Sequence, residues 1–167
     1  MNNIYLVGFM GTGKTVTGRV LAKKLSRRYL DLDELIEEKE RMSIPEIFSK
    51  NGEAYFRRLE NETLKIISSG QDLIVSCGGG IVVNKDNIDI MKKTGTIFCL
   101  TASADVILKR TSAFSNRPLL NVANPKEKIE SMLKERSPFY ALADHTIDTS
   151  NHLYAEDTAN KIMEFLV

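Results

Sequence analysis

One stretch near the beginning of the chain constrains its fold more than any other. Residues 8–15 match the pattern G-x-x-x-x-G-K-[ST] in full, after an apolar run at residues 4–7 and before a helical pattern at residues 16–25. A strand, this loop and a helix in that order form the context in which the pattern binds phosphate. Backbone N–H groups freed by the glycines can surround an anion, and the helix adds the positive end of its dipole. We therefore predict a nucleoside triphosphate site; the alternative is a glycine-rich turn followed by a solvated lysine.

Within this loop, two side chains have predicted chemical roles. Lys14 would reach the β- and γ-phosphates, and the Thr15 hydroxyl would bind Mg²⁺. The ATP-binding residues predicted here are Gly11, Thr12, Gly13, Lys14, Thr15 and Val16.

Composition sets limits on the kind of protein this is. The chain has 167 residues, 23 basic and 22 acidic, for a net charge of +1. That length suits one domain with a sizeable core, and that charge gives no general attraction to nucleic acid or to an anionic membrane. Residue 3 already begins a strand pattern, so we expect no signal peptide. Cys77 and Cys99 lie in apolar runs typical of buried thiols. We predict a single cytoplasmic domain over residues 1–167, without a nucleic-acid or membrane partner.

Strand and helix patterns alternate along the chain. We predict strands at about residues 3–8, 29–32, 72–77, 96–101 and 145–149, with helices in most of the intervals. This alternation indicates an α/β fold, with a parallel sheet covered by helices on both faces. In the first helix, at about residues 14–26, the apolar stripe predicted to face the sheet consists of Val16, Val20, Leu21 and Leu25.

Two carboxylates follow the second predicted strand. Asp31 and Asp33 are two residues apart, so they would lie on one face if the strand extended that far. Ligands of open α/β sheets bind at this end of the strands. Asp31 could hold a water of a Mg²⁺ shell, and Asp33 could accept a proton from an attacking hydroxyl. Alternatively, Asp33 only caps a helix that begins at Glu34.

A charged face marks the long helix predicted from Glu53 to about Ser68. Glu53, Arg57 and Glu60 are spaced so that they share this face. The pattern alone favours a salt-bridge ladder on the surface. Arg57 could equally present its planar guanidinium to a substrate carboxylate.

Three further segments have features of a ligand site. Residues 78–80 are three glycines after a strand, which would allow close approach of a ligand, although they could also form a flexible turn. Residues 111–120 have no strong periodicity and carry Arg117, which indicates a mobile flap that closes over phosphates. We predict that the next helix ends near residues 136–138, with Arg136 either complementing the helix dipole or anchoring a carboxylate.

Taken in order, these features closely resemble the shikimate kinase family, within the nucleoside monophosphate kinase-like P-loop group. The resemblance spans nearly the whole chain. It rests on residues 8–15, 31–33, 56–60 and 78–80, and on residues 117–120 followed by 136–140. It implies a three-layer P-loop kinase fold with a five-stranded parallel sheet of order 2-3-1-4-5 and a mobile lid. It also implies a monomer that transfers the γ-phosphoryl group of ATP to the 3-hydroxyl of shikimate.

The resemblance further implies a role for individual residues. It makes Asp33 the partner of the shikimate hydroxyls and the base, within an acceptor-binding region at about residues 33–61. In the acceptor pocket it implies that Arg57 and Arg136 hold the carboxylate and that Gly79 and Gly80 line the pocket. On the nucleotide side it implies that Arg117 closes with a lid at about residues 111–123, that Arg110 lies near adenine, and that Thr15 and Asp31 place Mg²⁺. Two alternatives stay open: a related kinase acting on gluconate or a nucleoside monophosphate, and a nucleotide-binding regulatory module without useful turnover.

Overall fold

The architecture is a parallel sheet enclosed by helices, as the strand–helix alternation predicts. The computed structural model describes residues 2–112, 120–151 and 154–166. Within these residues one five-stranded sheet has the order β2-β3-β1-β4-β5, and each pair of neighbours is parallel. Its strands are β1 (Asn3–Val7), β2 (Arg28–Asp31), β3 (Leu73–Ser76), β4 (Gly95–Thr101) and β5 (His145–Asp148). The predicted α/β fold and strand order are confirmed.

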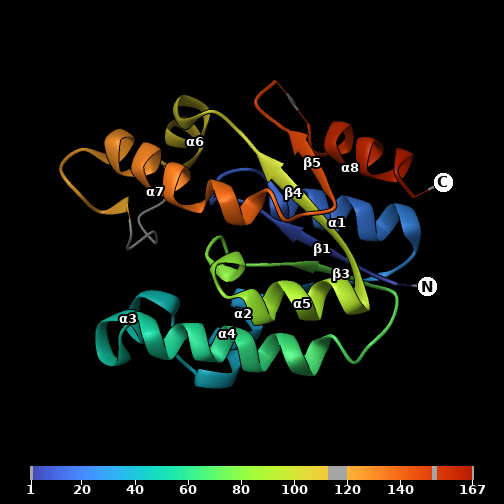
Figure 1. Cartoon of the computed structure of the whole chain (residues 1–167), viewed down its shortest axis with the longest axis horizontal. Helices are drawn as coiled ribbons and strands as arrows, with labels where there is room; N and C mark the ends of the chain where they lie inside the picture. The colour runs from blue at the N-terminus through green and yellow to red at the C-terminus, as the bar shows by residue number, and fades with distance from the viewer. Residues whose placement is uncertain (1, 113–119, 152–153, 167) are drawn as a thin grey trace.

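Helices cover both faces of the sheet (Figure 1). The helices are α1 (Lys14–Leu25), α2 (Leu32–Glu40), α3 (Ile44–Asn51), α4 (Glu53–Ile67), α5 (Lys85–Thr94), α6 (Ala104–Thr111), α7 (Pro125–Tyr140) and α8 (Ala155–Glu164), with a short 3-10 helix η1 (Ile81–Val83). No helix of the described residues is both long and apolar enough to cross a membrane.

Alternate residues of β1 supply two different cores. Ile4 and Leu6 pack with α1 and α8, whereas Tyr5 and Val7 pack with α4 and α5 on the opposite face. Successive side chains of a strand point to opposite faces, and here both faces are buried, which explains the continuous apolar run of β1. Both cysteines are free thiols in the core that packs with α4 and α5, and burial raises the pKa of Cys99 to about 11.

A third apolar cluster supports the phosphate loop from the side. Phe9 is buried against α6, α7 and Leu120, the first described residue after the gap at 113–119. This packing fixes the loop to the two helices that flank the predicted flap. A displacement of α7 would therefore be transmitted directly to the backbone of the loop.

The structure corrects two local predictions about helices. Val16 does not face the sheet but is 56% exposed, because the buried side of α1 is formed by Thr17, Gly18, Leu21 and Ala22. Helix α7 does not end at residues 136–138 but runs through Pro138 to Tyr140. Proline removes a backbone donor from a helix interior, and the burial of Tyr140 holds the last turn in place despite that loss.

The strand-face prediction for Asp31 and Asp33 is also wrong. Strand β2 ends at Asp31, and Asp33 already belongs to α2. The Asp31 carboxylate caps this helix by accepting from the backbone N–H groups of Asp33 at 3.0 Å and Glu34 at 3.3 Å. Asp33 is therefore not the cap, and the helix begins at Leu32 and not at Glu34.

Candidate active site

Of the predicted site residues that the structure describes, all but Thr12 line one cleft at the carboxyl ends of the strands. The cleft has a volume of about 920 Å³ and is lined from the phosphate loop, α2, α3, α4, the glycine loop at residues 78–80, Arg110 and Arg136. Segments more than 100 residues apart in sequence thus meet where β1 and β3 end. Lys14, Arg57 and Arg136 all open onto this same space.

In the phosphate loop, the backbone requires glycine at defined positions. Gly8 and Gly11 have φ angles of +136° and +81°, and a Cβ on Gly11 would lie 2.8 Å from the Thr111 side chain. The Lys14 ammonium arches back over the loop and donates to the carbonyl oxygens of Gly8 at 2.8 Å and Phe9 at 3.0 Å. The positive charge therefore lies at the mouth of the loop, where a phosphate would enter.

Two residues of the loop region differ in what they present to the cleft. The Thr12 side chain is buried and donates to the Phe9 carbonyl at 2.7 Å, so it does not line the cleft. Val16, by contrast, lines the cleft with its exposed side chain. Of the two ATP contacts predicted here, the structure brings only Val16 to the cleft.

Thr15 and Asp31 form a pair of oxygen donors beside the loop. The Thr15 hydroxyl donates to Asp31 Oδ2 at 3.2 Å, and the Tyr29 hydroxyl donates to the same oxygen at 3.1 Å. Burial and the Asp31 charge together raise the pKa of Tyr29 to about 12, so this phenol remains a donor. Among the described residues no group of three or more His, Cys, Asp or Glu could hold a metal ion. A hydroxyl and a carboxylate that leave most positions to phosphate and water are a set that fits Mg²⁺.

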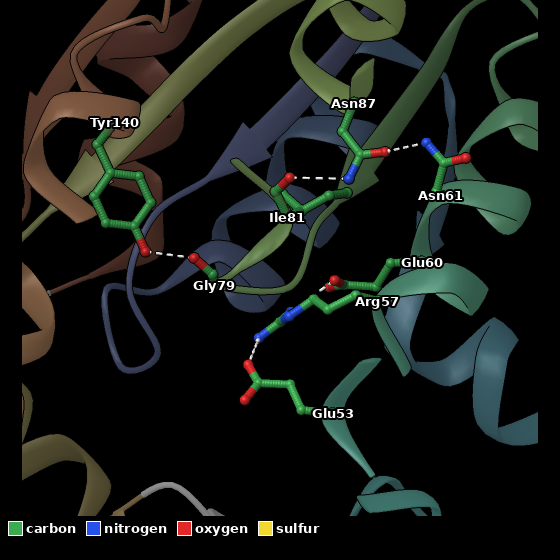
Figure 2. A network of polar contacts seen from close by, with 8 residues as sticks. All are labelled: Glu53, Arg57, Glu60, Asn61, Gly79, Ile81, Asn87 and Tyr140. Carbon is green, nitrogen blue, oxygen red and sulfur yellow. Dashed lines mark hydrogen bonds and ion pairs between the residues drawn. The ribbon is translucent and has the colours of Figure 1, made fainter. Parts of the chain in front are cut away.

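Three charged side chains of α4 are linked to one another beside the glycine loop (Figure 2). Arg57 donates through Nη1 to Glu60 Oε2 at 2.6 Å and through Nη2 to Glu53 Oε1 at 3.1 Å. The Glu60 side chain is fully buried, and that of Arg57 is only 25% exposed. Burial raises the pKa of Glu60 to about 7, although Arg57 acts in the opposite direction. The surface interpretation is therefore wrong for Arg57 and Glu60.

Each glycine of residues 78–80 lies against a charged side chain of the cleft. A Cβ on Gly78 would lie 2.7 Å from Glu60 Oε1, and one on Gly79 would lie 3.3 Å from Arg136 Nη1. A Cβ on Gly80 would overlap the guanidinium of Arg57. Close approach, and not a flexible turn, is the reason that glycine is needed here.

Arg136 lies in the cleft and not at a helix end. It is four residues before the end of α7, is 7% exposed, and stacks its guanidinium 5.6 Å from the centre of the Phe9 ring. Among the described residues its Nη1 has no hydrogen-bond partner. A buried cation that faces a cleft with a free donor is suited to hold an anionic group. The helix-dipole alternative does not fit this position.

Arg110 connects the phosphate loop to the end of β5. It donates to the Gly11 carbonyl at 3.1 Å and to the Thr149 carbonyl at 2.8 Å, and it also lines the cleft. These bonds place its charge beside the loop backbone. Arg117, the arginine predicted for the lid, lies outside the described residues.

Some residues of the site had no predicted role in it. Phe48 and Phe56, whose rings are 5.0 Å apart, form an apolar wall of the cleft. Met10 of the phosphate loop lines the cleft as well. In the sequence these side chains are ordinary helix or loop residues, and the position of Phe56 directly before Arg57 was the one available signal.

Comparisons with known proteins agree with this geometry. The model of the family described as shikimate kinase matches residues 10–167. The shikimate kinase of Thermodesulfovibrio yellowstonii is 48% identical over 98% of this chain and 94% of its own. That of Thermoanaerobacter pseudethanolicus is 41% identical over 98% of this chain and 95% of its own.

Solved structures show the same fold. Shikimate kinase from Acinetobacter baumannii in complex with shikimate has a TM-score of 0.95 and 41% identity, covering 99% of this chain and 93% of that one. The enzyme from Aquifex aeolicus has a TM-score of 0.82 and 35% identity, covering 98% and 95%. On this evidence, the chain belongs to the shikimate kinase family of ATP-dependent kinases.

Proposed function

We propose that the chain transfers the γ-phosphoryl group of ATP to the 3-hydroxyl of shikimate, giving ADP and shikimate 3-phosphate. One observation carries the proposal: a phosphate loop, the buried Arg136 and the partly buried Arg57 share a single cleft beside a glycine wall. A small carboxylated polyol needs a cationic anchor for its acid and an acceptor for its reacting hydroxyl. The cleft supplies both, and the family membership supports the same assignment.

The acceptor site is formed by α2, α4, the glycine loop and α7. Arg57 and Arg136 bind the carboxylate of shikimate, while Gly79 and Gly80 line the space between the two guanidinium groups. The fork of a guanidinium matches a carboxylate with two parallel hydrogen bonds. Asp33 lies beside Gly78, where a Cβ would meet its Oδ1 at 3.1 Å, so its carboxylate reaches the same pocket. It accepts the proton of the 3-hydroxyl as that oxygen attacks.

On the other side of the cleft, the loop binds the phosphates of ATP. The N-terminus of α1 and the Lys14 ammonium stabilise the negative charge of the transferring group. For the lid at about residues 111–123, we propose that Arg117 adds a further positive charge on closure. Arg110 and Val16 contribute to the nucleotide side of the cleft, and Thr12 contributes through its backbone.

Mg²⁺ is the proposed cofactor, held by the Thr15 hydroxyl and, through water, by Asp31. When bound, it neutralises charge on the β- and γ-phosphates. The two protein donors are already hydrogen-bonded to each other at 3.2 Å, which supports this placement.

An acceptor screen tests the proposal. ADP release is measured with shikimate, gluconate and nucleoside monophosphates side by side, each with ATP and Mg²⁺. Of these acceptors, we expect only shikimate to give fast ADP release. Release that is equally slow with every acceptor, or with none, would support the regulatory module and refute the proposal. We further infer a cytoplasmic monomer that needs no nucleic acid, from the family resemblance and the net charge of +1; sedimentation of the active enzyme tests the oligomeric state.

A further inference from the structure

Side chains that do not line the cleft form hydrogen bonds with the backbone at the glycine loop of the acceptor pocket. The Tyr140 hydroxyl donates to the Gly79 carbonyl at 2.5 Å, and Asn87 Nδ2 donates to the Ile81 carbonyl at 2.9 Å (Figure 2). Tyr140 is 7% exposed and Asn87 is 1% exposed. Both are therefore fixed in the protein interior, with their polar groups directed at the loop.

These bonds belong to a chain of contacts between the two helices that carry the arginines. Asn87 Oδ1 accepts from Asn61 Nδ2 at 2.8 Å, and Asn61 lies on α4 four residues after Arg57. At the other end, Tyr140 lies on α7 four residues after Arg136. Helix α4 is thus connected through Asn61 and Asn87 to Ile81, directly after the glycine loop, and α7 is connected through Tyr140 to Gly79 within the loop.

The loop itself leaves these two carbonyls available. Its internal bonds run from Ile81 N–H to the Gly78 carbonyl and from Val83 N–H to the Gly80 carbonyl, both at 3.2 Å. Burial raises the pKa of Tyr140 to about 12, so its hydroxyl stays protonated and donates at any physiological pH.

Position matters at this loop because it touches both guanidinium groups. Any Cβ on Gly80 would overlap Arg57, and one on Gly79 would come within 3.3 Å of Arg136. The position of the loop backbone therefore limits where both cations can lie. Two cations that share one carboxylate must keep a fixed separation to form bidentate bonds.

We propose that Tyr140 and Asn87 are positioning residues of the acceptor pocket, which set the separation of Arg57 and Arg136 by holding the loop between them. Neither side chain contacts the acceptor. This inference rests on the proposed function and extends it, since it says how the carboxylate site keeps its shape.

The test compares Tyr140→Phe with Tyr5→Phe, which is a matched control. Tyr5 is also buried, in the same core, and its hydroxyl also makes a hydrogen bond, to Thr94 Oγ1 at 2.7 Å, but Thr94 is the last residue of α5, whereas Asn87 lies near the start of that helix. Loss of one such bond corresponds to a change of about threefold to tenfold in an equilibrium constant. We expect Tyr140→Phe to raise the KM for shikimate by about that factor, with the KM for ATP within about twofold of the wild type. Tyr5→Phe should leave both constants unchanged.

A second variant tests the other contact, through Asn87 to the Ile81 carbonyl. Asn61→Ala removes the bond to Asn87 at the partly exposed end of the network, so it tests the link without opening the core. This variant should also raise the KM for shikimate and leave the KM for ATP unchanged. An unchanged KM for shikimate in both Tyr140→Phe and Asn61→Ala, or an equal rise in Tyr5→Phe, would overturn the proposal. A wild-type enzyme that does not phosphorylate shikimate would instead refute the proposed function, so the two failures are distinguishable.

Discussion

Replacing Arg57 with alanine is the sharpest test of the acceptor site. The Arg57 side chain lines the cleft and is 25% exposed, beside fully buried Glu60. Removing one partner of a buried charge pair costs about 2–5 kcal/mol in binding. Because Arg57 retains some contact with solvent, we expect the lower part of that range, about 2–3 kcal/mol, which corresponds to a rise of about 30-fold to 150-fold in the KM for shikimate.

Arg57→Ala should stay folded, which keeps the kinetic result interpretable. The variant leaves Glu60 without its partner at 2.6 Å, and a buried unpaired carboxylate would destabilise the protein strongly. However, the pKa of Glu60 is already about 7, so this carboxyl takes up a proton near neutral pH and escapes most of that cost. We expect the melting temperature to fall by less than about 6 °C, or about 2 kcal/mol in a chain of this size.

The assay is a titration of shikimate at saturating ATP, and of ATP at saturating shikimate, with ADP release as the signal. Arg58→Ala is the matched control, since Arg58 is the next residue on α4 but is 65% exposed and reaches Glu62 only at 3.9 Å. Exposed pairs of this kind contribute little. A KM for shikimate within about threefold of the wild type in Arg57→Ala, or an equal rise in Arg58→Ala, would refute the assignment.

Three further predictions concern groups around the same cleft. First, burial raises the pKa of Glu60 from 4.5 in the unfolded chain to about 7 in the folded one, so its contribution to stability is complete below pH 4.5 and is lost as the pH rises through 7. In urea unfolding, the free energy of unfolding should fall by up to about 3 kcal/mol between pH 4.5 and pH 8, and Glu60→Gln should remove this decrease. An identical decrease in the variant would contradict the cause. Second, Gly80→Ala should raise the KM for shikimate more than Gly79→Ala, because the new Cβ overlaps Arg57 in the first but only approaches Arg136 at 3.3 Å in the second; the reverse order in steady-state kinetics would count against the geometry. Third, Lys14→Ala and Asp33→Asn should each abolish phosphoryl transfer while the circular dichroism spectrum stays native, and turnover retained in both would overturn the mechanism.

Much of the fold could be predicted because its signals are local. The apolar run of β1, buried on both faces, and the glycine pattern at residues 8–15 each have one common structural meaning. The strand order was different: it came from the resemblance, since hydrophobic periodicity does not say which strands are neighbours. Val16 shows the limit of periodicity, because the first turn of α1 extends beyond the sheet and exposes an apolar residue to the cleft.

The candidate site was harder to predict where the environment decides the role of a side chain. Spacing places Arg57 and Glu60 on one face of a helix, but it does not reveal that this face is buried, and the same spacing is common in surface ladders. The capping role considered for Asp33 belongs to Asp31 for a related reason: the capping bonds of Asp31 start α2 earlier than the strand pattern indicates. Tyr140 belongs to the segment that carries the resemblance, but its contact could not be predicted because its partner is a backbone carbonyl 61 residues away in the chain.

Direct observation of the product tests the central claim that phosphate and acceptor meet in this cleft. Purified enzyme is incubated with ATP, Mg²⁺ and shikimate, and the products are followed by phosphorus NMR. The scalar coupling between each phosphorus nucleus and the ring protons shows which hydroxyl carries the phosphate. We predict one new phosphate monoester, coupled to the proton on C3 of shikimate, that appears in step with ADP. Inorganic phosphate in place of an ester, or an ester on another hydroxyl, would contradict the placement of Asp33 and the two arginines around the acceptor.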